Sequence, residues 1–224
     1  MDHNLLSLGS LGLGCHSTQS DISSFGPSRS QEHSQTSPQL VHRGNDTAIY
    51  RLNDTGFKVI LKPNPPEEQI LKFLHEQNIS NFLPWSCRKR KVIDVTSFDR
   101  RPALSFKWAS GITLKQWLQK AQGAHVDLNV RLRAAMAVAK TLSDFHDGGV
   151  VYNCLTPDNI VLAPYEGEYV ATFIDLSSAI IYRDDSKKDP DVAFEKQVKK
   201  ADLKSIGSIF DQIFRGGNRG TGQE

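Results

Sequence analysis

Hydrophobic and polar positions change their spacing along the chain, and this spacing predicts the secondary structure. Short segments rich in apolar and β-branched residues are typical of strands, whereas apolar residues three or four positions apart are typical of helices. The predicted strands are 40–43, 48–52, 57–62, 92–97, 103–108, 160–162 and 170–174. The predicted helices begin at Glu67, at Thr113, after Asp127 and near Ala201. Strands first, followed by helices with one hairpin between them, predict an α+β fold.

The helix after Asp127 has the clearest apolar stripe. Asp127 is a suitable N-cap and Gly148-Gly149 a suitable end, so the helix is bounded on both sides. We expect the stripe to face the core. It consists of Leu128, Leu132, Ala135, Met136, Ala139, Leu142 and Phe145.

The two ends of the chain differ in composition from the middle. Residues 1–40 are dominated by Ser, Gly, Gln and His, and such a segment buries too little apolar surface to offset its conformational entropy. We therefore expect a disordered tail over 1–40, one domain over 41–214 and a flexible tail over 215–224.

Composition narrows the functional classes. The chain has 224 residues, 38% of them hydrophobic, and a net charge of +2, which argues against a dedicated nucleic-acid-binding protein. The run 88–91, Arg-Lys-Arg-Lys, is interpreted as a solvated hairpin turn, with a phosphate-binding or localisation patch as the alternative. The three cysteines have no metal-site spacing. No apolar run is long enough to span a bilayer and no signal peptide is recognisable, so we expect a soluble, cytoplasmic protein without membrane partners.

Two segments carry the strongest candidate chemistry. Residues 152–162 read Tyr-Asn-Cys-Leu-Thr-Pro-Asp-Asn-Ile-Val-Leu, and residues 173–177 read Phe-Ile-Asp-Leu-Ser. The pair resembles the catalytic loop His-Arg-Asp-x-Lys-Pro-x-Asn and the metal-binding Asp-Phe-Gly of protein kinases. The resemblance implies a bilobal fold with a small antiparallel-sheet N-lobe over 41–106, a hinge over 107–111 and a reduced, mainly helical C-lobe over 112–214.

Aligned on these motifs, four residues have assigned positions. The resemblance places Asn159 and Asp175 as ligands of Mg²⁺. Cys154 occupies the position of the catalytic base, and Thr156 that of the lysine in the catalytic loop. A thiol with an ordinary pKa is mostly neutral at pH 7 and is a poor proton acceptor. We therefore assign no catalytic residue.

The same resemblance suggests a nucleotide site. It places Lys62, at the end of the strand 57–62, on the phosphates and pairs it with Glu67, or with Glu68 as the alternative. An exposed lysine at a strand end is the competing interpretation of Lys62. The segment Gly44–Tyr50 contains only one glycine where kinases use several to cover the phosphates. The adenine wall and hinge are assigned to Phe106, Lys107, Trp108 and Ala109.

These residues together predict a divergent kinase-like domain with impaired catalysis, a pseudokinase. It would bind ATP and Mg²⁺ weakly and act in signalling through contacts with other proteins. The alternatives are an active serine/threonine-type kinase with an atypical catalytic loop, or a small-molecule phosphotransferase.

Overall fold

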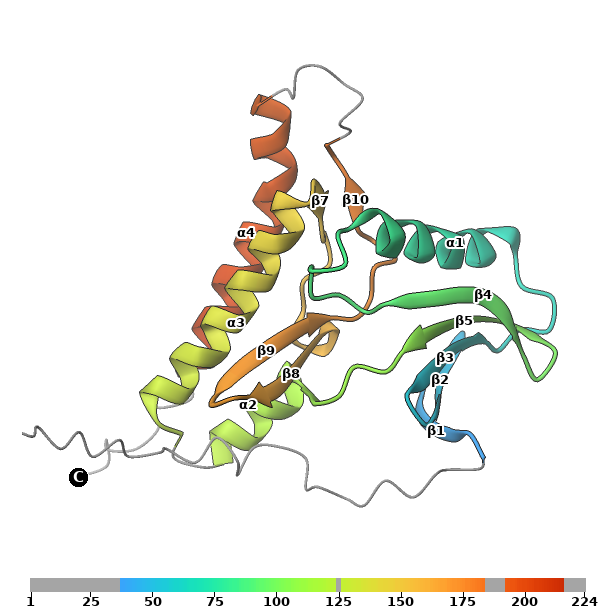
Figure 1. Cartoon of the computed structure of the whole chain (residues 1–224), viewed down its shortest axis with the longest axis horizontal. Helices are drawn as coiled ribbons and strands as arrows, with labels where there is room; N and C mark the ends of the chain where they lie inside the picture. The colour runs from blue at the N-terminus through green and yellow to red at the C-terminus, as the bar shows by residue number, and fades with distance from the viewer. Residues whose placement is uncertain (1–36, 124–125, 184–191, 216–224) are drawn as a thin grey trace, which may run out of the picture.

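A five-stranded antiparallel sheet occupies one end of the molecule (Figure 1). The computed structural model of the chain describes residues 37–123, 126–183 and 192–215, so most of the predicted N-terminal tail and nearly all of the C-terminal one lie outside the described residues. The strand order is β1-β2-β3-β5-β4. The strands are β1 (Gln39–Arg43), β2 (Thr47–Leu52), β3 (Thr55–Ile60), β4 (Val92–Phe98) and β5 (Arg101–Lys107).

Helix α1 (Glu67–Phe82) lies along one face of this sheet (Figure 1). Its buried side chains are spaced as expected for a helix that presents one face to a sheet: Phe73, Glu76, Ile79 and Ser80. Phe73 forms a small core with Ile60 of β3, Leu104 of β5 and Val92 of β4. This core fixes the face of β3 that α1 covers.

The second part of the chain is mainly helical and is joined to the sheet by residues 108–111. Helices α3 and α4 run side by side, and α3 also packs against a hairpin of β8 and β9 (Figure 1). The helices are α2 (Leu114–Gly123), α3 (Leu128–Asp147) and α4 (Val192–Arg215). The strands are β6 (Ile112–Thr113), β7 (Val150–Val151), β8 (Ile160–Tyr165), β9 (Glu168–Phe173) and β10 (Ile180–Ile181), with the short 3-10 helix η2 (Pro157–Asn159) before β8. The described residues therefore form an α+β fold, as predicted.

Local sequence signals account for several element ends. Gln116 donates its backbone N–H to Thr113 Oγ1 at 3.2 Å, and Thr113 donates its own to Gln116 Oε1 at 3.0 Å. This reciprocal capping box confirms Thr113 as the start of α2. Asp127 accepts from the backbone N–H of Asn129 at 2.7 Å, which confirms it as the N-cap of α3.

The predicted apolar stripe of α3 is wrong in part. Leu128, Leu132 and Met136 are 61%, 42% and 67% exposed, so this row faces solvent in the described structure. The buried face is a neighbouring row that includes Ala134 and Val138. Small side chains allow α3 to pack closely against β9, and the sequence does not reveal which of two adjacent apolar rows makes that contact.

Two further predictions need correction. Helix α4 begins at Val192, nine residues before Ala201; the segment 192–200 contains good helix formers such as Ala, Glu, Gln and Lys. Residues 88–91 do not form a hairpin turn. Arg90 donates its backbone N–H to Phe173 O at 2.7 Å, and the Arg90 side chain is buried, so this segment connects the two parts of the fold.

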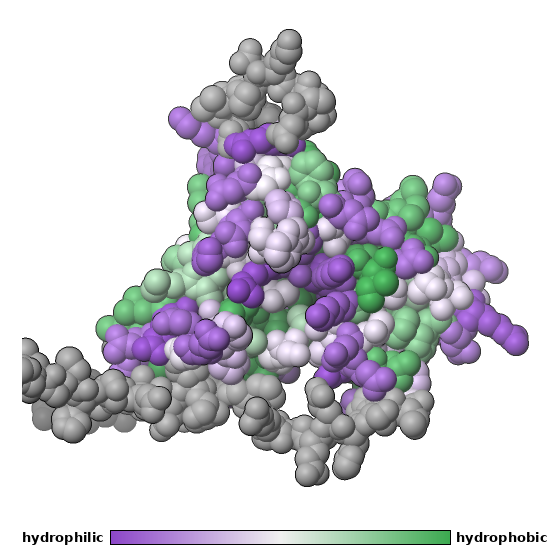
Figure 2. Space-filling view, viewed as in Figure 1, coloured by the Kyte–Doolittle hydropathy of each residue, from purple (hydrophilic) through white to green (hydrophobic). Residues whose placement is uncertain are grey.

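Most of the apolar core lies in the helical part, around Trp117, Phe145 and Phe173. Polar side chains gather in the middle of the face seen in Figure 2, between α1 and the pair α3 and α4. Within the described residues, no helix combines the length and apolar character needed to cross a bilayer.

Candidate functional site

Strand β3 delivers a lysine to the space beneath α1. Side chains alternate between the faces of a strand, so Lys58 shares a face with Ile60, which packs against Phe73 of α1. The Lys58 ammonium lies 5.8 Å from the centre of the Phe73 ring. Its side chain is only 15% exposed. Lys58 is therefore held in a partly desolvated position by the packing of β3 against α1.

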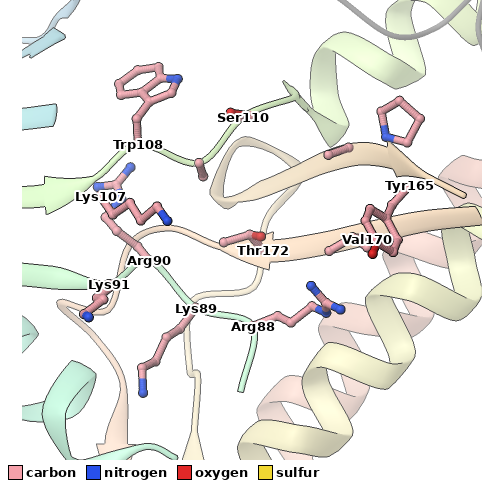
Figure 3. A pocket seen from close by; sticks show the side chains of 13 residues that line it. Arg88, Lys89, Arg90, Lys91, Lys107, Trp108, Ser110, Tyr165, Val170 and Thr172 are labelled. Carbon is pink, nitrogen blue, oxygen red and sulfur yellow. The ribbon is translucent and has the colours of Figure 1, made fainter. Parts of the chain in front are cut away.

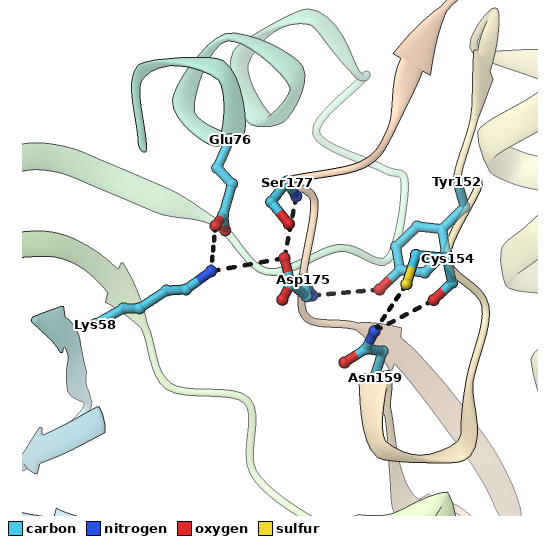
Figure 4. A network of polar contacts seen from close by, with 7 residues as sticks. All are labelled: Lys58, Glu76, Tyr152, Cys154, Asn159, Asp175 and Ser177. Carbon is cyan, nitrogen blue, oxygen red and sulfur yellow. Dashed lines mark hydrogen bonds and ion pairs between the residues drawn. The ribbon is translucent and has the colours of Figure 1, made fainter. Parts of the chain in front are cut away.

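Glu76 of α1 is the partner of this lysine. It lies one helical turn after Phe73 on the same face, and its side chain has no exposed surface. Lys58 Nζ donates to Glu76 Oε1 (Figure 4), whereas Glu76 Oε2 has no hydrogen-bond partner. A buried carboxylate of this kind depends on its hydrogen-bonded cationic partner.

Asp175, which belongs to a third segment, also contacts Lys58. Lys58 Nζ lies 3.6 Å from Asp175 Oδ1, just after the end of β9 (Figure 4). The backbone N–H of Ser177 donates to Asp175 Oδ1 at 3.0 Å and holds the carboxylate in place. Lys58 thus joins β3, α1 and the segment after β9.

The segment with Asn159 lies beside Asp175. Ile174 donates its backbone N–H to Asn159 O at 3.0 Å, and Asp175 donates its own to the Tyr152 hydroxyl at 3.3 Å. Asn159 Nδ2 donates to Cys154 O at 3.2 Å and lies 3.9 Å from the Cys154 sulfur (Figure 4). The structure therefore brings Cys154, Asn159 and Asp175 into one site, as their spacing in sequence suggested.

A buried aspartate holds the start of this loop. Asp202 of α4 accepts from the backbone N–H groups of Tyr152 at 2.8 Å and Asn153 at 2.7 Å, and it also contacts His146 Nε2 at 2.9 Å. Asn153 has a φ of 63°, in the left-handed region. The two backbone hydrogen bonds stabilise this unusual conformation and orient the residues that follow.

The pKa values of the two carboxylates in the site are shifted in opposite directions. Burial raises the pKa of Glu76, and the charge on Lys58 opposes this only in part. Burial also acts to raise the pKa of Asp175, but Lys58, the hydrogen bonds from Ser177 and the charge on Arg90 outweigh it and lower that pKa. Asp175 is therefore the carboxylate poised to stay ionised, as a cation ligand must be.

The hinge residues have distinct environments. Phe106 is 1% exposed, and its ring fills the space in front of Gly56, where a Cβ atom would lie 2.2 Å from Phe106 Cε2. On its other side the Arg90 guanidinium lies 4.0 Å from the ring centre. Trp108 donates its backbone N–H to Asp54 O, and Lys107 to Lys91 O. Phe106 is thus a core wall, while Lys107, Trp108 and Ala109 form the connection beside it.

The structure does not bring Lys62 and Glu67 together. Lys62 follows the end of β3, is 55% exposed and pairs with Asp46 at 3.2 Å. Glu67 is exposed at the start of α1, and the alternative, Glu68, pairs with Lys72. The expected ion pair is absent because the strand ends at Ile60, and prolines then lead the chain away from the sheet.

Sequence reasoning missed Lys58, Glu76 and Arg90. One signal was present: Glu76 interrupts the apolar row of α1 between Phe73 and Ile79. A charged residue in the middle of an apolar row is unusual unless it is paired.

Other expected features of a nucleotide site are weak. The backbone N–H of Gly44, in the turn between β1 and β2, already donates to Thr47 O at 2.8 Å. Within the described residues, no group of three or more His, Cys, Asp or Glu side chains gathers to hold a metal ion. Asn159 and Asp175 offer two side-chain oxygens, and Mg²⁺ would need substrate phosphates and water to complete its coordination there.

No protein-family model matches this chain, and no curated protein matches it significantly.

Proposed function

We propose that this chain is a divergent, bilobal protein-kinase-like domain. In this proposal the sheet and α1 form the N-lobe over 41–106, residues 107–111 are the hinge, and residues 112–214 form a reduced C-lobe. The domain binds Mg²⁺–ATP weakly, transfers phosphate poorly or not at all, and acts in signalling through contacts with other proteins in the cytoplasm.

One observation carries the proposal. Protein kinases require an ion pair between a lysine of the third strand and a glutamate of the helix that follows, together with an aspartate that holds Mg²⁺. Here Lys58 of β3 pairs with Glu76 of α1 and lies 3.6 Å from Asp175. Lys58 and Glu76 lie outside the loop motifs, so their position beside Asp175 adds support that the motifs alone do not give.

Individual residues of the site are assigned to hold Mg²⁺ and ATP. Asn159 and Asp175 would hold Mg²⁺, which would neutralise phosphate charge, and Lys58 would contact the phosphates. Without ligand, the cations Lys58 and Arg90 face the anions Glu76 and Asp175, so the formal charges of this group cancel. The group therefore carries no excess positive charge to attract the phosphates of a nucleotide, which favours weak binding.

The catalytic impairment follows from the loop. Cys154 is exposed at the position of the base, and Thr156 stands at the position of the lysine. A missing general base typically costs about 10²- to 10⁴-fold in rate. No carboxylate replaces it locally, because Asp158, the nearest in sequence, points to Lys115 of α2 at 3.1 Å.

A thermal-shift titration with ATP, with and without Mg²⁺, tests nucleotide binding. At a ligand concentration a hundredfold above Kd, we expect about 2.7 kcal/mol of stabilisation. Asp175→Ala should abolish the Mg²⁺-dependent part, whereas the control Asp158→Ala, which removes an exposed carboxylate 60% accessible to solvent, should retain it. An unchanged Tm of the wild type at millimolar Mg²⁺–ATP would reject nucleotide binding.

Phosphate transfer is tested with a generic protein substrate. We expect negligible turnover by the wild type and partial activity in Cys154→Asp, because that change restores a carboxylate ionised at neutral pH. The double variant Cys154→Asp/Thr156→Lys should be more active than the single one. Robust wild-type turnover that is lost in Asp175→Ala but kept in Cys154→Ala would instead establish an active kinase.

A further inference from the structure

A basic pocket lies beside the hinge and shares Arg90 with the ion-pair network. Its volume is about 300 Å³, near the lower limit for small-molecule sites. It is lined by residues 88–91, by residues 107–110 and by the β8–β9 hairpin (Figure 3). Its lining includes the hinge residues Lys107, Trp108 and Ala109, but none of Lys58, Glu76, Asn159 or Asp175. It is therefore distinct from the part of the proposed nucleotide site assigned to the phosphates and Mg²⁺.

The charged residues that line the pocket are all basic. Five of its residues are basic and none is acidic; the basic ones are Arg88, Lys89, Arg90, Lys91 and Lys107. Burial lowers the pKa of Lys89, and the charge on Lys91 adds to this while Cys87 opposes it. Several positive charges around one concave surface favour an anionic ligand.

The walls of the pocket are fixed by backbone hydrogen bonds. Lys107 donates its N–H to Lys91 O at 2.8 Å, which holds the hinge beside the start of β4. Arg90 donates to Phe173 O at 2.7 Å, and Phe173 donates to Arg88 O at 3.3 Å. The cations are thus presented by preformed backbone, which reduces the ordering cost of binding.

The basic side chains differ in how far they are already engaged. Lys89 donates to Leu83 O and Pro84 O, and in Figure 3 its side chain points away from Tyr165 and Val170. Arg90 is 6% exposed, and its Nε has no hydrogen-bond partner. An unpaired N–H on a buried guanidinium costs stability unless something satisfies it.

Arg88 and Lys107 are the cations most available to a ligand. Both are exposed, and neither forms an ion pair with an acidic residue of the described ranges. The Arg88 side chain extends beneath Tyr165 and Val170 (Figure 3), on the hairpin side of the pocket. Lys107 comes from the opposite, hinge side. In Figure 3 the Arg90 side chain lies near Lys107, so the three cations line two sides of the pocket.

We propose that this pocket binds a small polyanion with clustered phosphate groups, held by Arg88, Arg90 and Lys107. A guanidinium can bind phosphate through two parallel hydrogen bonds, and a lysine adds a point charge. Tyr165 adds an aromatic wall for an organic part of the ligand. The volume suits a compact molecule.

Isothermal titration calorimetry with inorganic tripolyphosphate, without Mg²⁺ and at constant ionic strength, tests the proposal. The double variant Arg88→Gln/Lys107→Gln should bind at least about tenfold more weakly, because it loses two charge-assisted contacts. The matched control Lys120→Gln/Lys204→Gln removes two exposed charges from α2 and α4 and should bind like the wild type. Equal affinities of the wild type and the first double variant, or equal losses in both double variants, would overturn the proposal.

A third variant separates this pocket from the proposed nucleotide site. Lys58→Met/Glu76→Leu removes the ion pair without leaving a lone buried charge, and it should leave tripolyphosphate binding unchanged. Loss of binding in this variant alone would place the anion at Lys58 and refute the pocket. Phosphatidylcholine vesicles with and without a phosphoinositide then identify the source of the phosphates. If the protein binds the phosphoinositide vesicles and Arg88→Gln/Lys107→Gln does not, the ligand is a lipid headgroup. If the protein binds tripolyphosphate but not the vesicles, the ligand is a free metabolite. Both results support the pocket.

Discussion

Removal of Lys58 should destabilise the protein strongly, whereas removal of Lys62 should not. In Lys58→Met, the carboxylate of Glu76 keeps its fully buried position but loses the one hydrogen-bond donor that it has among the described residues. Removing one partner of a buried ion pair typically costs about 3–5 kcal/mol. For a domain of this size the loss corresponds to a fall in Tm of roughly 6–20 °C.

The matched control is Lys62→Met, which makes the same chemical change four positions later. Lys62 and its partner Asp46 are 55% and 56% exposed, so their ion pair is screened by water. Such pairs contribute about 0–1 kcal/mol. The contrast between the two variants therefore measures the effect of burial rather than the effect of losing a lysine.

Rescue and pH dependence test the physical cause. Lys58→Met/Glu76→Leu should recover at least half of the lost stability, because no unpaired carboxylate stays buried. The pKa of Glu76 is raised in the folded state, so folding favours its neutral form. The stability of the protein is therefore lost as the pH rises through the folded-state pKa of Glu76. Without Lys58 this effect grows, so the deficit of Lys58→Met should be larger at pH 8 than at pH 5.

Urea unfolding followed by circular dichroism at both pH values provides the measurement. Similar losses in Lys58→Met and Lys62→Met, or a deficit that grows as the pH falls, would refute the assignment of Lys58–Glu76 as a buried ion pair.

Two further predictions concern packing and the loop. Gly56→Ala should cost about 1–3 kcal/mol, because the added Cβ would lie 2.2 Å from the Phe106 ring, and Gly56→Ala/Phe106→Leu should recover part of that cost. Asp202→Asn should also cost about 1–3 kcal/mol, because its amide group cannot accept from the backbone N–H groups of both Tyr152 and Asn153.

Controls for these two variants lie on α4. Gly207 has no atom within 4 Å of an added Cβ, so Gly207→Ala should stabilise the helix by about 0.5–1 kcal/mol. Asp211 is 44% exposed, and Asp211→Asn should change stability by less than about 1 kcal/mol. Thermal unfolding compares each pair, and a test variant no less stable than its control would contradict the predicted contact.

Much of the fold could be predicted because its signals are local. The α+β order, the N-cap Asp127 and the cap Thr113 depend on residues a few positions apart, and the structure confirms them. The apolar face of α3 could not be predicted in the same way. Two adjacent rows of α3 are apolar, and only the packing against β9 and α4 determines that Ala134 and Val138 are buried while Leu132 and Met136 are exposed.

Some residues of the candidate site could likewise be predicted from local sequence, and others could not. Cys154, Asn159 and Asp175 could be recognised from the sequence because short motifs hold them at characteristic spacings. Lys58 and Lys62 occupy the same phase of one apolar segment, so local sequence does not distinguish them. Only the register of β3 and the end of that strand at Ile60 determine which lysine is covered by α1.

The sequence by itself thus determined the order of elements, their caps and the loop residues, because each depends on backbone geometry within a few positions. The tertiary structure alone decided that Glu76 is the partner of Lys58, and that Arg88 and Lys107 line one pocket. These pairs are separated by 18 or more residues, and they meet only because strand pairing and helix packing bury the apolar surfaces around them.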